Sequence, residues 1–353
     1  MIKYLGSKRL LLPHIVAAFA ELPDVRRVGD LFSGTARVGR ALREAGYEVL
    51  ANDQLRFAST LARCYVAATL DEAARAERHL ADLQRTPPRA GYFTETFCRD
   101  ARYFHPKNGA RVDAIRDALD ELDVSENVRA ILLVSLMEAA DRVDSTTGVQ
   151  MAYLKSWAKR AHNDLELRLP ALVPGKGRAR EGDALDAAKE ELDAVYLDPP
   201  YNQHSYLGNY HIWETLVRWD EPEPYGVARK RSDCRERKSA FNSKRKIEDA
   251  FRAVVAAVRA PNLVVSFNNE GYLSRDTVVE ILETKGHVGV VPVAFGRYVG
   301  AKIGIHNPQG RKVGTISHTE NKELIFVVAP EPETVERACA SVRAVGSPLA
   351  RRG

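Results

Sequence analysis

The chain has 353 residues and a formal net charge of +5, and 45% of its residues are hydrophobic. This composition allows one large domain with an insertion, or two modest domains. No run of about 18 apolar residues predicts a membrane span, and the start lacks a signal-peptide pattern, so we expect a cytoplasmic protein without membrane contacts. Four dispersed cysteines have no metal-binding spacing, which favours free thiols and predicts no metal site.

The first seventy residues predict a parallel α/β arrangement. A short apolar run over 27–32 leads through a turn at 33–35 into a helical pattern over 36–45. A second apolar run over 47–51 is followed by a helical pattern over 55–70. Strand, glycine turn, helix and strand form a βαβ unit, which predicts a parallel sheet.

Residues 71–175 interrupt this alternation. They show helical periodicity over 112–122 and 125–140, and no β-branched apolar runs. We therefore predict a mainly helical insert over 71–175.

The α/β pattern then resumes. Strands are predicted over 193–197, 262–267, 288–294 and 324–328, and helices over 246–259 and 277–284. The Gly-rich stretch 296–321 is interpreted as a hairpin. The catalytic domain is accordingly placed at 1–70 and 176–330, with a C-terminal tail, a short helix and a frayed end, over 331–353.

The sequence Asp198-Pro199-Pro200-Tyr201 directly follows a predicted strand. Ligands of open α/β sheets bind at the carboxyl ends of strands. An aspartate and a proline-fixed carbonyl provide two hydrogen-bond acceptors at one point, which suits an –NH2 group, and Tyr201 offers a face for stacking a base. The motif favours a site for the exocyclic amine of a base; a proline-rich turn capping the strand is the alternative.

A second motif follows the first predicted strand, and it consists of Asp30, Leu31, Phe32, Ser33, Gly34 and Thr35. Its glycine permits a close approach of a ligand to the backbone. It is not GxGxxG, so a dinucleotide site is less strongly indicated.

Two further acids belong to the same pattern. Asp53 ends the second predicted strand, where an acid holds ribose hydroxyls in nucleoside-binding sheets. Asp183 precedes the strand before Asp198. We expect Asp183 either to accept a hydrogen bond from an adenine amine of a cofactor or to cap a helix.

Positive charge is concentrated over 226–246, where nine basic residues face two acids. That segment is +7, which leaves −2 for the remainder of a chain at +5. The basic residues are Arg229, Lys230, Arg231, Arg235, Arg237, Lys238, Lys244, Arg245 and Lys246. Such a loop suits a polyanion, and a solvated, partly disordered loop is the alternative.

Five motifs in this order resemble those of the adenine-specific DNA methyltransferases, the family that includes Dam, and in particular the FokI-type modification enzymes. They are KYLGSK at 3–8, DLFSGT at 30–35, ND at 52–53, GD at 182–183 and DPPY at 198–201; the segment 202–216 is similar as well. The resemblance covers 1–64 and about 180–330. It implies a Rossmann-like fold that uses S-adenosylmethionine to methylate N6 of an adenine flipped out of double-stranded DNA.

The resemblance also assigns roles to residues. The methionine part of the cofactor would be surrounded by Tyr4, Lys8, Phe32, Ser33 and Gly34. Lys8 would lie near its carboxylate, although a lysine is more commonly exposed. The ribose would be held by Asp53, and the flipped base by Asp198, Pro199 and Tyr201.

The motif order is that of the family's alpha group, which makes 71–175 the expected target-recognition domain. The basic segment would contact DNA, and the aromatic residues Tyr210 and Trp213 would either join it or lie in the core. A cognate restriction endonuclease is an expected partner type, and we expect a monomer.

Other functions remain open from the sequence. N4 of cytosine makes the same chemical demands as N6 of adenine. An RNA base methyltransferase would usually lack the insert and the KYLGSK start, and a protein-amide methyltransferase would more often have Asn at position 198. A non-catalytic DNA-binding subunit would be expected to have lost Asp53 or the DPPY motif.

Overall fold

The computed structural model describes residues 1–6, 8–151, 156–269, 271–296, 305–306, 312–314 and 320–346. The main sheet has seven strands in the order β3-β2-β1-β4-β7-β11-β8. Their bounds are β1 (Arg27–Asp30), β2 (Glu48–Asp53), β3 (Gly177–Glu181), β4 (Ala194–Leu197), β7 (Asn262–Asn268), β8 (His287–Gly296) and β11 (Glu320–Ala329).

The sheet is parallel from β3 to β7, and β11 runs antiparallel to both of its neighbours. Strand order along the chain reverses at β1, which lies between β2 and β4. This mostly parallel α/β sheet is consistent with the predicted Rossmann-like methyltransferase fold. A cleft at the carboxyl ends of β1 and β4 is the place where such sheets bind ligands.

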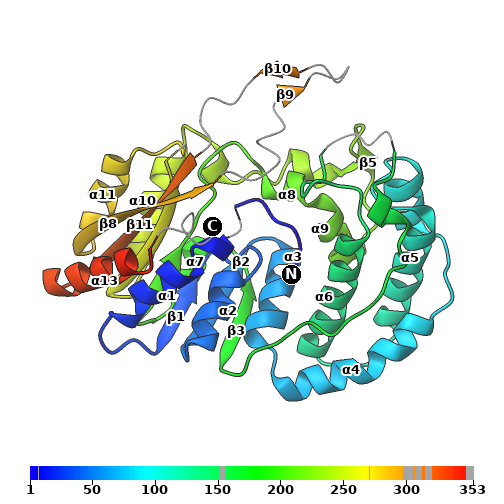
Figure 1. The fold of residues 1–353 in the computed structure, drawn as a ribbon, viewed down its shortest axis with the longest axis horizontal. Coiled ribbons are helices and arrows are strands. Elements are labelled where there is room, and N and C mark those ends of the chain that lie inside the picture. The colour runs from blue at the N-terminus through cyan, green and yellow to red at the C-terminus, as the bar shows by residue number, and fades with distance from the viewer. Residues whose placement is uncertain are drawn as a thin grey trace.

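Helices cover both faces of the sheet (Figure 1). Those on one face are α1 (Leu12–Ala20), α2 (Arg37–Glu44), α3 (Arg56–Ala62) and α13 (Pro332–Ala344); those on the other are α7 (Ala184–Ala187), α10 (Ile247–Ala257) and α11 (Arg275–Glu283). Strand side chains alternate between the two cores: Tyr196 and Val264 belong to the first, and Val195 and Val265 to the second.

The region predicted as a helical insert contains α4 (Leu70–Arg85), α5 (Pro106–Asp120) and α6 (Glu126–Arg142), which stand beside α9 (His211–Arg218) in Figure 1. Buried side chains of α4, α5 and α6 belong to the same hydrophobic cluster as one face of the sheet. Their packing is therefore continuous with the α/β core.

The helix predicted over 55–70 is shorter in the structure. The α-helix α3 passes into the π-helical segment η2 (Arg63–Ala67), and Thr69 then starts α4. Thr69 and Glu72 form a reciprocal capping box. The cap at Thr69, two residues after η2, marks the start of a separate helix.

Three other segments refine the predictions. Strand β3 was not expected, because the sequence GRARE is charged, and it lies at the sheet edge, where charge is tolerated. Strands β8 and β11 flank the hairpin predicted over 296–321, and they pair with each other. Within 296–321 the described residues are the ends of β8 and β11 and two short strands, β9 (Ile305–His306) and β10 (Lys312–Gly314), which pair with each other. The tail helix α13 packs against α1 and β8, while 347–353 lie outside the described residues.

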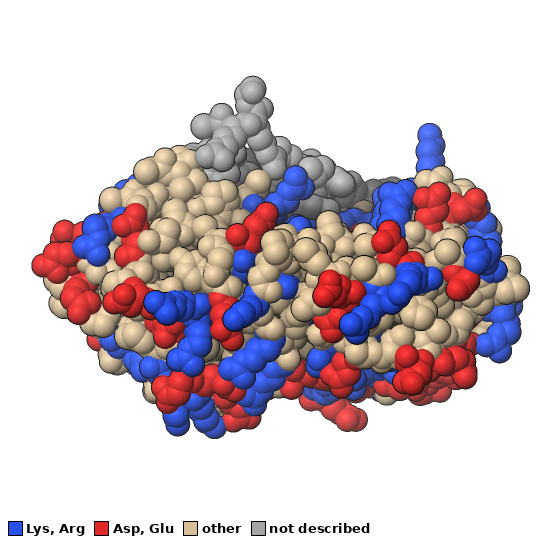
Figure 2. Space-filling view, turned by 90° about the horizontal axis from the view of Figure 1, so that it is seen from below, with Lys and Arg blue, Asp and Glu red and all other residues tan. Residues whose placement is uncertain are grey.

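In the described parts of the chain, no helix is long and apolar enough to cross a membrane. On the face shown in Figure 2, basic and acidic side chains are interspersed among the coloured residues.

Candidate active site

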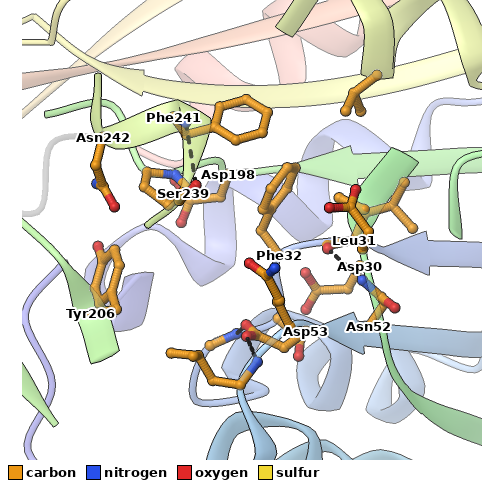
Figure 3. A pocket seen from close by; sticks show the side chains of 18 of the residues that line it. Asp30, Leu31, Phe32, Asn52, Asp53, Asp198, Tyr206, Ser239, Phe241 and Asn242 are labelled. Carbon is orange, nitrogen blue, oxygen red and sulfur yellow. Dashed lines mark hydrogen bonds between the residues drawn. The ribbon is translucent and has the colours of Figure 1, made fainter. Parts of the chain in front are cut away.

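Four acids at strand ends line one cavity, and Figure 3 labels three of them, Asp30, Asp53 and Asp198. Asp30 and Asp53 are the last residues of β1 and β2, Asp183 follows β3, and Asp198 follows β4. The cavity has a volume of about 450 Å³, which is within the range of small-molecule sites. The sequence motifs therefore converge at the carboxyl edge of the sheet.

The loop after β1 is tied to the end of β2. One carboxylate oxygen of Asp53 accepts the Gly34 N–H at 2.9 Å, and the other accepts the Leu55 N–H at 3.0 Å. Gly34 has a φ of +50°, and a Cβ there would lie 3.3 Å from the Tyr4 hydroxyl oxygen. The glycine thus keeps the backbone open at the cavity. Burial raises the pKa of Asp53 to about 6, and the Leu55 and Gly34 amides lower it again in part.

Three buried polar atoms along this wall have no hydrogen-bond partner among the described residues: Asp30 Oδ1, Ser33 Oγ and Asn52 Oδ1. Asp30 Oδ2 does accept the Gly39 N–H at 2.9 Å. Burial raises the pKa of Asp30 to about 8. Because buried polar atoms are normally paired, these three suit a polar ligand that carries positive charge.

Aromatic rings form the remaining walls. Phe32 and Phe241 meet edge to face at 5.2 Å, and Figure 3 shows them pointing toward each other. Tyr4, Tyr206 and Tyr210 form a cluster of nearly parallel rings, with Tyr4 at centroid distances of 5.2 and 4.6 Å from the other two, which are 6.4 Å apart. Flat apolar surfaces beside polar groups can enclose a nucleoside or a base.

Asp198 is held from the buried side. Its Oδ1 lies 2.9 Å from the Lys8 ammonium and 3.3 Å from the Ser266 hydroxyl, which also bonds the Tyr196 hydroxyl at 2.7 Å. No contact of Oδ2 is found among the described residues, and the side chain lines the cavity. Burial and the neighbouring Glu323 charge raise the pKa of Asp198 to about 6, against the lowering effects of Lys8 and Ser266.

Lys8 lines the cavity, and the alternative of an exposed lysine does not hold. It is not exposed, since only 6% of its surface is accessible. Its ammonium is paired with Asp198 and with Glu323. Burial alone would lower the pKa of Lys8, but these two carboxylates raise it well above its usual value, so the side chain stays charged.

The other residues of the DPPY motif are placed differently. Pro200 lines the cavity, whereas Pro199 and Tyr201 are not among its lining residues. The Tyr201 ring lies against Phe267 at 5.9 Å, and the Lys8 ammonium lies 5.6 Å from its centroid. Asp183 lines the cavity and also caps α7 by accepting the Leu185 N–H, so the capping alternative describes its observed contact.

A family model described as D12 class N6 adenine-specific DNA methyltransferase matches residues 4–274. The chain belongs to this family. This family decides between the alternatives that the sequence left open. The target is N6 of adenine in DNA, and the protein is an enzyme. A methyltransferase family also implies the use of S-adenosylmethionine.

Named relatives of this methyltransferase agree. The type II methyltransferase M.NlaIII of Neisseria lactamica is 31% identical over 305 residues, which are 83% of this chain and 90% of the relative. Modification methylase StsI of Streptococcus sanguinis is 29% identical over 94% of this chain, and type II methyltransferase M.FokI of Planomicrobium okeanokoites is 30% identical over 80%. The chain spans about half the length of the last two, with 52% and 47% covered.

The basic segment 226–246 of the methyltransferase is fully described and divides into two groups. Arg229 pairs with Asp100, Arg235 lies 4.0 Å over the Tyr225 ring, and Arg237 pairs with Glu214 and Asp233. Five other members have neither an ion pair nor a ring contact within the described structure, and these are Lys230, Lys238, Lys244, Arg245 and Lys246. All of the five except Lys230 are exposed.

Arg231 does not fit the prediction of a DNA contact. It is 4% exposed, and its two terminal nitrogens each lie 2.7 Å from a carboxylate oxygen of Asp220. Its Nε also contacts Asp233 at 3.1 Å. A buried, bidentate guanidinium is committed to the fold, so we withdraw it from the candidate DNA contacts.

Tyr210 and Trp213 are core residues, each 1% exposed, so the core alternative holds for both. Sequence reasoning assigned no role to four cavity residues: Tyr206, which lies in the family-like segment 202–216, and Ser239, Phe241 and Asn242, which belong to no motif. Asn242 donates to the backbone carbonyls of Asn202 and His204, which ties the basic segment to the segment after DPPY. The sequence offered one signal for them: Phe241 and Asn242 are an aromatic residue and an amide inside the basic segment 226–246.

Proposed function

We propose that this methyltransferase binds S-adenosylmethionine in the described cavity and methylates adenine N6 at a specific sequence of double-stranded DNA. The observation that carries the proposal is the convergence of Asp30, Asp53 and Asp198 on one cavity. There the unpartnered oxygens and the aromatic walls lie together. This combination suits a charged nucleoside ligand next to a base.

The cofactor half is assigned to the wall formed by the ends of β1, β2 and β3. Asp53 is suited to ribose hydroxyls, and Asp30 Oδ1 and Ser33 Oγ are suited to the positively charged methionine part. The full proposed set is Tyr4, Lys8, Asp30, Phe32, Ser33, Gly34, Thr35, Asp53 and Asp183. Lys8 acts here through its ion pairs at the border between the two halves.

The base half is assigned to Asp198, Pro199, Pro200 and Tyr201, together with Tyr206, whose ring lines the cavity. When bound, S-adenosylmethionine supplies a methyl group on a positively charged sulfur. The exocyclic amine of adenine is a poor nucleophile because its lone pair is delocalised into the ring. Hydrogen bonds from its N–H groups to Asp198 Oδ2 and to a motif carbonyl localise that lone pair, and they act where charge develops.

DNA contacts are assigned on two grounds. The exposed basic residues Lys238, Lys244, Arg245 and Lys246 are suited to phosphates. Residues 71–175 are the proposed target-recognition domain, by their position between the cofactor loop and DPPY. The names of the relatives support a role in a restriction–modification system with a cognate endonuclease. We further propose a monomer that acts in the cytoplasm.

The test is transfer of labelled methyl from S-adenosylmethionine to unmethylated DNA, followed by mass spectrometry of the nucleosides. We expect labelled N6-methyladenosine with the wild type and none with Asp198→Ala. Asp186→Ala, which removes an exposed carboxylate from α7, is the matched control and should transfer normally. Equal transfer by Asp198→Ala would remove Asp198 from the mechanism, and label spread over all adenines would contradict sequence specificity.

A further inference from the structure

Three charged side chains lie in a buried row behind the base site. Asp198 follows β4, Lys8 belongs to the 3-10 helix η1 (Lys8–Leu10), and Glu323 is on β11. The Lys8 ammonium contacts one oxygen of each acid. The side chains of Lys8 and Glu323 are 7% and 2% exposed, and that of Asp198 is 18% exposed.

The side-chain polar contacts of Asp198, a cavity-lining residue, all go to Oδ1 and leave Oδ2 without one among the described residues. Lys8 and Ser266 both bind Oδ1. Ser266 is itself bonded to Tyr196, so Oδ1 is fixed by groups that belong to the core. The carboxylate is thereby oriented, and Oδ2 is the oxygen available to a base.

We propose that Glu323 is a positioning residue for methyl transfer: it holds the Lys8 ammonium at Oδ1 of Asp198, so that Oδ2 stays free to accept an N–H of the target amine. The proposal rests on the proposed role of Asp198 at the base. Glu323 does not line the cavity, and it acts through Lys8.

A lone ammonium would serve Asp198 less well. In a buried site, a lysine with one acid partner is drawn toward both carboxylate oxygens, because that arrangement satisfies more of its three donors. A second acid occupies part of that donor capacity, so the ammonium is shared between two partners. It also shares the positive charge, so Asp198 remains a stronger hydrogen-bond acceptor.

The direction of the charge effects gives a distinctive signature. Burial raises the pKa of Asp198 to about 6; the Lys8 charge lowers this pKa, and the smaller effect of the Glu323 charge raises it. Loss of the Glu323 charge should lower this pKa, and loss of the Lys8 charge should raise it. The titratable groups that face Asp198 are Lys8, Glu323, Tyr4, Tyr196, Tyr201, Tyr206 and Asp30. Because Asp30 titrates nearby, the comparison between variants, not one profile, reports on Asp198.

The experiment measures the single-turnover rate of methyl transfer from preformed enzyme–DNA complexes between pH 5 and 9. For Glu323→Gln, which keeps the shape, we expect a rate reduced about 10-fold or more at the plateau, since misplacement of a reacting group costs on this order. On the acid side of its pH–rate profile, the acid limb, the rate should fall at a lower pH than in the wild type. The acid limb of Lys8→Met should lie at higher pH. Glu323→Asp, which keeps the charge, should retain the wild-type acid limb.

Glu333→Gln, an exposed isosteric change at the start of α13, is the control and should match the wild type. A wild-type rate in Glu323→Gln would overturn the proposal. A slow rate with an unshifted acid limb would also overturn it, because a purely structural defect slows transfer without moving a pKa. If Glu323→Gln does not fold, a shifted acid limb in Glu323→Asp would overturn it. Absence of transfer by the wild type would instead refute the proposed function.

Discussion

Exposed lysines and arginines of the basic segment should control DNA affinity, whereas Arg231 should control stability. We compare the triple variant Lys244→Ala, Arg245→Ala, Lys246→Ala with Arg231→Met. The first three side chains are exposed and without ion pairs in the described structure. Arg231 is buried against Asp220 and Asp233. Charge count alone would treat both variants as losses of DNA contacts.

The expected magnitudes separate the two roles. Each phosphate contact contributes a slope of about −0.9 to the logarithmic dependence of DNA affinity on salt, so three lost contacts reduce the slope by about 2.7. Over a fourfold rise in salt, the wild type should then lose about 40-fold more affinity than the triple variant. Removal of Arg231 leaves two carboxylates that water can still reach, since Asp220 and Asp233 are 42% and 25% exposed, so we expect a loss of about 1–3 kcal/mol of folding stability.

The assay is equilibrium DNA binding from 50 to 200 mM salt, together with chemical denaturation of each variant. The triple variant should have a shallower salt slope and wild-type stability, and Arg231→Met the reverse. A salt slope reduced by about 0.9 in Arg231→Met, with unchanged stability, would refute the assignment of Arg231 to the fold. An unchanged slope in the triple variant would remove those three residues from the DNA surface.

Three further predictions concern the site and its support. Glu214 is buried and pairs with Arg218 and Arg237, so Glu214→Gln should lower the free energy of unfolding by about 2–3 kcal/mol, measured by denaturant titration; no change would show that these pairs are dispensable. A Cβ at Gly177 would lie 2.4 Å from the Val66 carbonyl oxygen. Gly177→Ala should therefore lower the free energy of unfolding by about 1–3 kcal/mol in the same denaturant titration. As a control, Arg178→Ala, at the exposed neighbouring position of the same strand, should lower it by about 0.5 kcal/mol or less. Transfer by the wild type should decline as pH falls through about 6, because protonation of Asp198 converts an acceptor oxygen into a donor; a flat single-turnover rate down to pH 5 would contradict this.

The strand ends of the candidate site follow from local sequence. Asp30, Asp53 and Asp198 each end or follow a short apolar run, and the carboxyl ends of parallel strands lie at one edge. Their convergence on one cavity was therefore predictable without tertiary information. The family resemblance of the same motifs agrees with the family model that matches 4–274.

The partners of these acids depend on long-range pairing, and local sequence does not reveal them. Glu323 reaches Lys8 across 315 positions of the chain because β11 inserts between β7 and β8. Nothing in its immediate sequence distinguishes it from a surface acid. Strand β3 was missed for a related reason, since its pairing with β2, not apolar periodicity, makes it a strand.

The basic segment shows why a local charge count gives an incomplete prediction. Within 226–246 only two acids offset nine basic residues, which favours either phosphate binding or a solvated loop. In the folded chain, acids from other segments also reach it: Asp100, Glu214 and Asp220 pair with Arg229, Arg237 and Arg231. These pairs tie the segment to α9 and to residues outside it, and they leave Lys238, Lys244, Arg245 and Lys246 exposed without ion pairs in the described structure. The same segment can therefore be ordered by its arginines and still offer positive charge to DNA.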